Sequence, residues 1–145
     1  MTPYVEKHVP SKDLELFRRI ERLVHQLPDL DLGKDERGEP IILSCHMICR
    51  ALARMFPDVR VQDGRFAHVA QHSWLITKRG WVIDPYPVGI LGGPLLVGHE
   101  ISIYFHLYCE QPLTVSAFSQ DSFHRSVDRI GAVLQELDTE LVHLP

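Results

Sequence analysis

Hydrophobic positions near the start of the chain recur every three or four residues. They are Leu14, Phe17, Ile20, Leu23, Val24 and Leu27. This spacing places them on one face of an α-helix and predicts an amphipathic helix over this segment. Ser11 is the predicted N-cap, with Asp13 in the first turn, and Pro28 ends the helix. The polar segment 29–40 then reads as a loop.

A second helix is predicted to begin after Ser44, which has the side chain of a good N-cap. Its buried stripe consists of Cys45, Ile48, Cys49, Leu52 and Phe56. Pro57 follows this stripe and ends the helix.

Beyond residue 58 the pattern changes to one that is typical of β-strands. Val59 and Val61 alternate with polar neighbours, and 66–77 and 81–86 form two long extended stretches. A glycine-rich loop follows, and the apolar run 101–108 predicts a central strand.

The last 25 residues return to helical spacing. Asp121 or Ser122 begins this helix, and its apolar face is predicted to hold Val127, Ile130, Val133, Leu134, Leu137 and Leu141. The order helix, helix, strands, helix predicts a single α+β domain over 1–145 with a mainly antiparallel sheet.

Composition narrows the functional classes. The chain has 145 residues, is 45% hydrophobic and has a formal net charge of −4, with no basic stretch of the kind that nucleic acid requires. No apolar run is long enough to span a membrane, and the N-terminus lacks the apolar core of a signal peptide. Three cysteines favour free thiols over a disulfide framework, so we expect a cytoplasmic protein.

Cys45 has the position that a nucleophilic thiol needs. It directly follows the predicted N-cap, where unpaired N–H groups and the helix dipole favour the thiolate. Cys49 lies one turn further along the same face, where the dipole has faded, and we interpret it as core packing.

The hairpin between the two extended stretches decides whether a histidine and an aspartate meet. With a three-residue loop at 78–80 and Gly80 in the left-handed conformation, Trp74 faces Asp84. Since side chains alternate, His72 and Asp84 then point to one face as diagonal neighbours, roughly 7–8 Å apart between Cα atoms. A two-residue turn would put them on opposite faces. The longer loop therefore predicts that Asp84 orients the imidazole toward a thiol packed against that face.

Several motifs follow one another between residues 41 and 88: Ser44-Cys45, Cys49 with Leu52, Val61-Gln-Asp-Gly64, His72-Ser-Trp74-Leu and Trp81-Val-Ile-Asp84-Pro85. In this order they resemble the core of the transglutaminase-like superfamily, which is related to papain. The resemblance implies a papain-like α+β fold and an acyl-enzyme mechanism. Cys45 would be the nucleophile, His72 the general base and acid, and Asp84 the orienting carboxylate, with the backbone N–H of Cys45 as one oxyanion donor.

The resemblance implies attack on an amide or peptide bond, in a peptide, a protein or a small amide. We expect a hydrolase, a cysteine peptidase or amidase, that needs no cofactor or metal. Transglutaminase activity or an arylamine acetyltransferase-like acyl transfer uses the same triad. The alternative from another class is a non-catalytic interaction module. The sequence leaves the second oxyanion donor and the oligomeric state open.

Two further hypotheses concern substrate binding and metal binding. Trp74 could flank the site and bind substrate, although a core position is the more common role of such a tryptophan. A zinc site at Cys45, His46 and Cys49 is disfavoured because His46 points about 100° away from the two cysteines on a helix. His68 and His72 would lie roughly 13 Å apart along a strand, too far apart for one ion.

Overall fold

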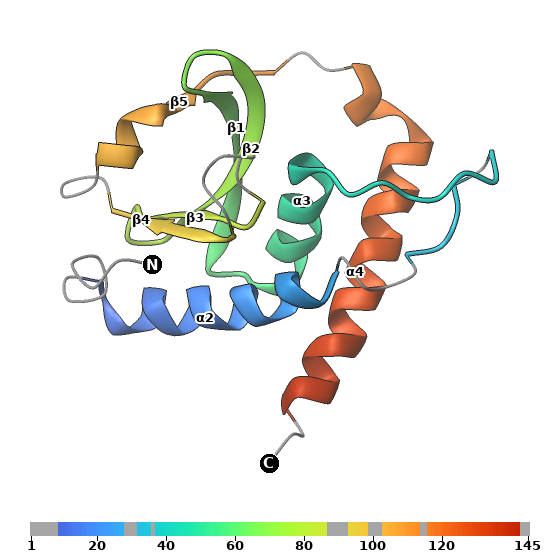
Figure 1. The fold of residues 1–145 in the computed structure, drawn as a ribbon, viewed down its shortest axis with the longest axis horizontal. Coiled ribbons are helices and arrows are strands. Elements are labelled where there is room, and N and C mark those ends of the chain that lie inside the picture. Colours follow the sequence, from blue (N-terminus) through green and yellow to red (C-terminus); the bar gives the residue numbers. More distant parts are fainter. Residues whose placement is uncertain are drawn as a thin grey trace.

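The computed structural model describes residues 9–27, 32–35, 37–86, 93–98, 103–113 and 116–142. Three α-helices and a five-stranded antiparallel sheet make up an α+β fold (Figure 1). The helices are α2 (Ser11–Gln26), α3 (Cys45–Met55) and α4 (Asp121–Val142). The order helix, helix, strands, helix is as predicted.

Two of the five strands have eight residues each, and the other three have three residues each. They are β1 (Val59–Phe66), β2 (Ala70–Thr77), β3 (Val82–Asp84), β4 (Leu95–Val97) and β5 (Tyr108–Glu110), arranged in the order β4-β3-β2-β1-β5. Two 3-10 helices, η2 (Ile103–Leu107) and η3 (Ser116–Ser119), precede β5 and α4. None of the described helices is both long enough and apolar enough to cross a membrane.

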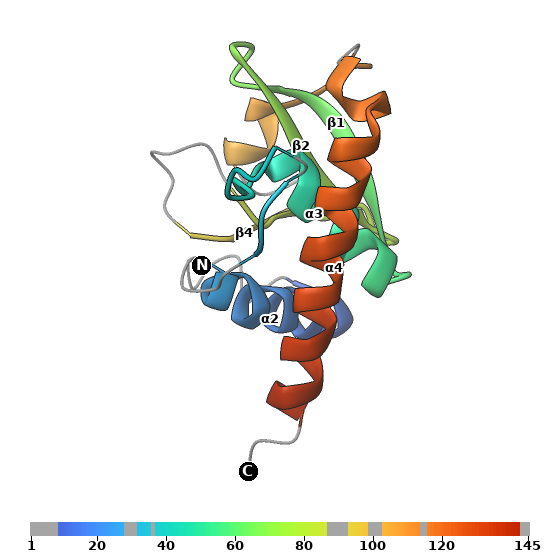
Figure 2. The same ribbon diagram turned by 90° about the vertical axis from the view of Figure 1, so that its right-hand side faces the viewer.

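Helix α3 lies between the sheet and α4, and α2 crosses below it (Figures 1 and 2). The main core joins the buried faces of all three helices to Leu75 and Ile83 on the sheet. A smaller cluster on the other face contains Phe66, Trp74, Val82, Val97 and Tyr108. Both faces of the sheet therefore carry apolar side chains, and α3 covers one of them.

The predicted helices form with small shifts at their ends. Ser44 caps α3 by accepting a hydrogen bond from the Met47 backbone N–H at 3.3 Å. For α2, Pro10 occupies the N-cap position instead of Ser11. Asp13 in its first turn is 1% exposed and pairs with Arg79 at 3.2 Å.

Two strand predictions are wrong. The stretch 66–77 is not one extended segment, because residues 67–69 turn the chain and β1 pairs with β2 as a hairpin. The predicted central strand 101–108 is η2 followed by β5, a short strand at the sheet edge, while 101 and 102 lie outside the described residues. Its apolar side chains Phe105 and Leu107 pack on the smaller cluster, which explains a strand-like composition without a strand.

The register of the second hairpin is confirmed. Leu75 pairs with Ile83 and Ile76 with Val82, the register of a three-residue loop at 78–80. Gly80 has a φ of +84°, a conformation that a residue with a Cβ rarely adopts. The Thr77 N–H donates to the Trp81 carbonyl at 2.9 Å and closes the loop. Position 72 on β2 and position 84 on β3 therefore have the register that the sequence predicts.

Candidate active site

His72 and Asp84 meet in the interior of the protein. The His72 Nε2 atom lies 2.8 Å from Asp84 Oδ2, and the two residues are 1% and 0% exposed. Because a carboxylate only accepts, the Nε2–H donates this bond and leaves Nδ1 as the free ring nitrogen. The predicted orienting contact is thus present.

Tyr108 is a second donor to the same carboxylate oxygen, which sequence reasoning missed. Its hydroxyl donates to Asp84 Oδ2 at 2.7 Å, and the Tyr86 backbone N–H donates to Oδ1 at 3.2 Å. These bonds satisfy a carboxylate that is fully removed from water. Burial and the neighbouring Asp84 charge raise the pKa of Tyr108 well above its ordinary value, so the hydroxyl stays neutral and remains a donor.

Aromatic rings surround the His72 imidazole. Its centroid lies 5.9 Å from the ring of Phe66, 6.1 Å from Trp74 and 6.3 Å from Tyr108. Trp74 is 1% exposed, so its ring is part of the wall behind His72 and not a surface open to a substrate. These rings fix the imidazole plane and keep water from the His72–Asp84 pair.

Cys45 is the first residue of α3 and is half-buried. Burial alone would raise the pKa of the Cys45 thiol, but hydrogen bonds with His46 and His72, the charge of His72 and the backbone at Ser73 together lower it to about 6. The helix start adds unpaired N–H groups and the positive end of the dipole. The surroundings of Cys45, those of His72 included, therefore favour the thiolate.

The pKa of His72 shifts in the opposite direction to that of Cys45. Burial alone would lower its pKa, but the hydrogen bonds to Asp84 and Cys45 and the charges of both groups raise the pKa of His72 to about 9. These two shifts favour a Cys45 thiolate together with a His72 imidazolium between about pH 6 and pH 9.

The approach of the thiol differs in one respect from the prediction. The buried side of α3 packs on Leu75 and Ile83, whereas Trp74 and Val82 belong to the cluster on the opposite face. The expected packing of the helix against the Trp74 face is therefore wrong. The His72 ring lies against Trp74, and the mutual pKa shifts of Cys45 and His72 are what connect the thiol to this ring.

Cys49 and Cys109 have other surroundings. Cys49 is 0% exposed within the main core, and its burial raises the pKa of this thiol well above the ordinary value. It is the core residue that the sequence predicts. Cys109 lies on β5, where its sulfur is 3.6 Å from the His68 ring. Among the described residues, no group of three or more His, Cys, Asp or Glu is placed to hold a metal ion.

No protein-family model, curated protein or solved structure matches this chain significantly.

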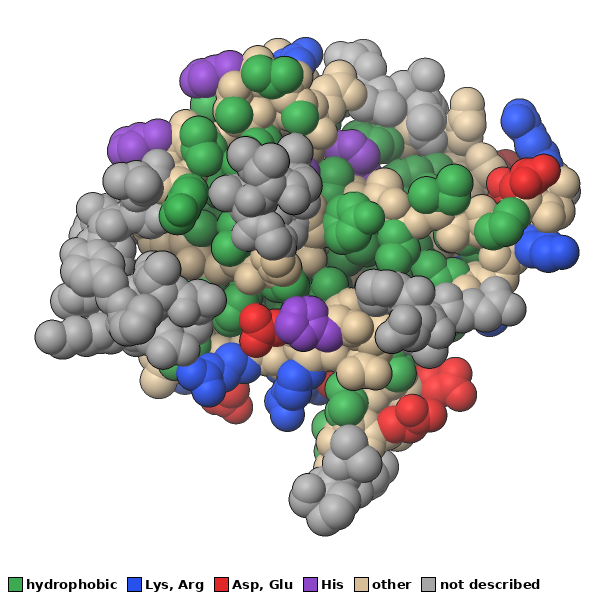
Figure 3. All heavy atoms as spheres, in the orientation of Figure 1, with side chains coloured by type: hydrophobic (Ala, Val, Ile, Leu, Met, Phe, Trp, Pro, Cys, Tyr) green, Lys and Arg blue, Asp and Glu red, His purple; other side chains and the backbone are tan. Residues whose placement is uncertain are grey.

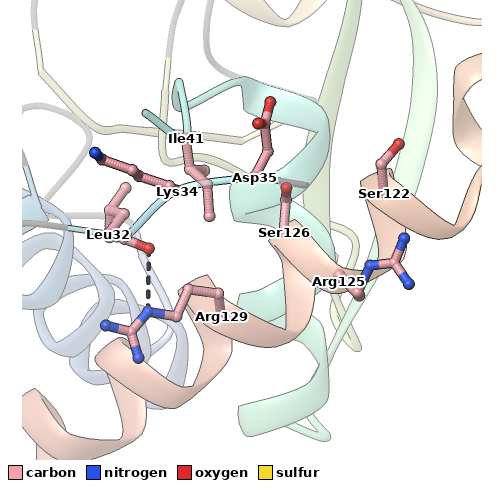
Figure 4. Close-up of a pocket in the computed structure, with 9 residues that line it drawn as sticks. Leu32, Lys34, Asp35, Ile41, Ser122, Arg125, Ser126 and Arg129 are labelled. Carbon is pink, nitrogen blue, oxygen red and sulfur yellow. Dashed lines mark hydrogen bonds between the residues drawn. The ribbon is translucent and has the colours of Figure 1, made fainter. Parts of the chain in front are cut away.

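A separate cavity of about 440 Å³ lies beside the start of α4 (Figure 4). Its lining contains none of Cys45, His72 and Asp84. Lys34 and the two arginines of α4 that line it extend in different directions, and Arg129 donates to the Leu32 carbonyl at 3.1 Å (Figure 4). The cationic groups thus do not converge on a common binding point, and the cavity is not part of the candidate site.

Proposed function

We propose that this chain is a cysteine-dependent acyl-transferring enzyme of the transglutaminase-like, papain-related kind, acting as a peptidase or amidase. The observation that carries the proposal is the buried His72–Asp84 hydrogen bond of 2.8 Å next to a helix-start thiol whose pKa is lowered to about 6. A thiolate, a base and a group that orients the base are what nucleophilic thiol catalysis requires.

The steps of the reaction follow from these positions. The Cys45 thiolate attacks the carbonyl carbon of an amide and forms the C–S bond, while the carbonyl electron pair moves to oxygen. The backbone N–H of Cys45 is one of the first N–H groups of α3, which intrahelical bonding leaves without a carbonyl partner, and it would stabilise this oxyanion. When the C–N bond breaks, the His72 imidazolium gives its proton to the leaving amine. Water or another acceptor then releases the acyl group.

The exposed hydrophobic side chains of the protein favour an uncharged substrate. Hydrophobic side chains gather over the middle of the face shown in Figure 3, with most of the lysines, arginines and carboxylates of that view toward its margins. Ile42, three residues before Cys45, is 82% exposed, and Tyr86, two residues after Asp84, is 44% exposed. An amide or peptide segment fits such a setting better than a phosphorylated or polyanionic molecule.

The decisive experiment measures which thiol reacts. Iodoacetamide at pH 7, followed by peptide mass spectrometry, should label Cys45 far faster than Cys49 or Cys109. His72→Ala should remove this preference, and an amide-directed acyl probe should form an adduct on Cys45. Equal labelling of the accessible thiols, with no acyl adduct, would favour an interaction module that keeps the fold without the chemistry.

The ion pair predicts a characteristic pH dependence. Alkylation of Cys45 should rise as pH increases through about 6, because thiolate forms there, and then level off. Amide turnover should rise over the same range but fall as pH increases through about 9, because the His72 imidazolium that protonates the leaving amine is lost. The two limbs belong to the pair as a whole. Turnover that keeps rising above pH 10 would contradict this assignment.

A further inference from the structure

A second chain of polar side chains leads to the same thiol through His46. This residue follows Cys45 in α3, and its side chain helps to lower the pKa of the Cys45 thiol. The His46 Nδ1 atom lies 2.6 Å from the Ser73 hydroxyl, which donates to Asp63 Oδ1 at 2.5 Å. Arg50 then donates to Asp63 Oδ2 at 2.8 Å. Two imidazoles, those of His46 and His72, therefore influence the Cys45 thiol, and each is held by its own hydrogen bonds.

The direction of each hydrogen bond fixes the tautomer of His46. A hydroxyl has one hydrogen, and Ser73 uses it on the Asp63 carboxylate, which only accepts. The contact between His46 and Ser73 must therefore run from the Nδ1–H to the hydroxyl oxygen. Nδ1 is thus committed to Ser73, and Nε2 carries the lone pair that can take up a proton.

Hydrogen bonds hold the His46 ring in place, as they hold the ring of His72, but His46 is more exposed to solvent. Ser73 is 0% exposed, whereas His46 is half-buried and its ring packs 4.9 Å from the ring of Phe118. Arg50 stacks on the same ring at 4.5 Å and also donates to the His46 carbonyl at 3.1 Å. A histidine that served packing alone would not need a buried hydroxyl, a carboxylate and a guanidinium to fix its ring.

We propose, on the basis of the function proposed above, that His46 is a second catalytic base that activates the acyl acceptor. His72 neutralises the leaving amine during acylation and is then uncharged. In the second half-reaction, His46 Nε2 takes a proton from water as the water oxygen bonds to the acyl carbon. The tetrahedral intermediate collapses, the C–S bond breaks, and its electron pair returns to the sulfur. The proton on His46 then passes to His72, which restores the ion pair, and the acid product leaves.

Ser73, Asp63 and Arg50 are positioning residues in this scheme. They hold the Nδ1–H tautomer and the ring plane, and none of them has to touch the substrate. Loss of this support should slow the second half-reaction and leave the first one nearly intact.

The test separates the two half-reactions with p-nitrophenyl acetate. Wild-type protein should release a burst of p-nitrophenol as Cys45 is acetylated, followed by a slower steady rate that reports deacylation. In His46→Asn, the amide nitrogen can replace Nδ1 as the donor to Ser73, but the Nε2 function is lost. We expect deacylation slower by about 100-fold and a burst that slows much less, because without His46 the pKa of the Cys45 thiol rises but its nucleophile remains. Acetylated Cys45 should therefore accumulate in the mass spectrum.

Asp63→Asn is the second variant, because it keeps the side-chain shape and removes the charge behind Ser73. It should slow deacylation about tenfold with the burst unchanged, and circular dichroism should show that both variants are folded. Deacylation at the wild-type rate in both folded variants would overturn the proposal, as would an equal loss of burst and steady rate. Wild-type protein that never forms acetyl-Cys45 would instead refute the proposed function on which this inference depends.

Discussion

The two histidines next to Cys45 have the same side chain but very different supports. His72 is 1% exposed and bonds directly to a carboxylate, behind a wall of Phe66, Trp74 and Tyr108. His46 is half-buried and reaches its carboxylate through a hydroxyl. Burial and the directness of the contact with a carboxylate therefore distinguish the two rings, although both lower the pKa of the same thiol.

The charges behind the rings differ as well. The Arg50 guanidinium pairs with Asp63 at 2.8 Å and offsets the charge of that carboxylate. In the described part of the chain, the side chains that hydrogen-bond to Asp84 are those of His72 and Tyr108, of which only His72 can carry a positive charge. The field of Asp84 is therefore directed at His72. This contrast suggests that one imidazole serves as the counter-ion of the thiolate and the other as a proton carrier.

The largest effect is expected when the direct support is removed. Asp84→Asn keeps the size of the side chain but removes the charge that holds the His72 imidazolium. Amide turnover should fall by about three to four orders of magnitude, as when the orienting carboxylate of a serine protease is replaced. Turnover with a peptide amide substrate checks this.

Asp128→Asn is the matched control for that substitution. Asp128 is an exposed carboxylate on α4 that pairs with Arg54, outside the site. Its variant should keep wild-type turnover. If Asp84→Asn were as active as this control, the buried pair would be structural only.

A smaller effect is expected from a substitution at Gly64 that crowds the aromatic side chains behind His72. A Cβ on Gly64 would lie 2.1 Å from the Cys109 carbonyl oxygen and 2.6 Å from Trp74, both closer than real Cβ contacts. Gly64→Ala must therefore push β5 or Trp74 away and should destabilise the fold by about 1–3 kcal/mol. Urea unfolding followed by tryptophan fluorescence measures this change.

Gly38 provides the control for backbone effects, although its φ of +77° adds strain of its own. A Cβ there meets no atom within 4 Å, so Gly38→Ala should cost only the conformational strain. Gly64 has no positive φ, so a wild-type free energy of unfolding for Gly64→Ala would show that crowding there does not matter.

The smallest effect is expected from Tyr108→Phe. Asp84 Oδ2 then loses the 2.7 Å hydroxyl bond but keeps the bond from His72, and Oδ1 keeps the bond from the Tyr86 backbone N–H. The loss of one hydrogen bond to this buried charged acceptor should lower the free energy of unfolding by about 1–2 kcal/mol. Turnover should fall severalfold because the carboxylate is less firmly placed. Chemical denaturation and steady-state kinetics check the two parts, and wild-type values in both would mean that the hydroxyl bond is unimportant.

The sequence predicts those parts of the protein that depend on local rules. Helical spacing identifies the three helices, Ser44 marks the start of α3, and Gly80 fixes the loop that aligns His72 with Asp84. Each of these signals lies within a few residues of the feature that it determines.

The parts that sequence reasoning misses depend on contacts between distant segments. Tyr108 reaches Asp84 from β5, 24 residues away, and no local pattern marks that pairing. The turn after Phe66 contains no glycine, although Ala67 and His68 have φ values of +54° and +61°. The rotation of about 100° between Cys45 and His46 on a helix argues against a zinc site there, yet it brings the His46 ring to Ser73 on β2, a contact that no local pattern marks.

The three-residue loop at 78–80 has a consequence for how such a protein can change. His72 and Asp84 lie on opposite arms of the hairpin that this loop closes, so the number of residues in it determines whether they face each other. Lys78 in this loop is paired with Asp58 near the surface, where both side chains are largely exposed. Deleting a single residue of this loop would leave Cys45, His72 and Asp84 themselves unchanged. The imidazole and its carboxylate would nevertheless point to opposite sides of the sheet. A single insertion or deletion at a remote surface position would therefore abolish the His72–Asp84 contact.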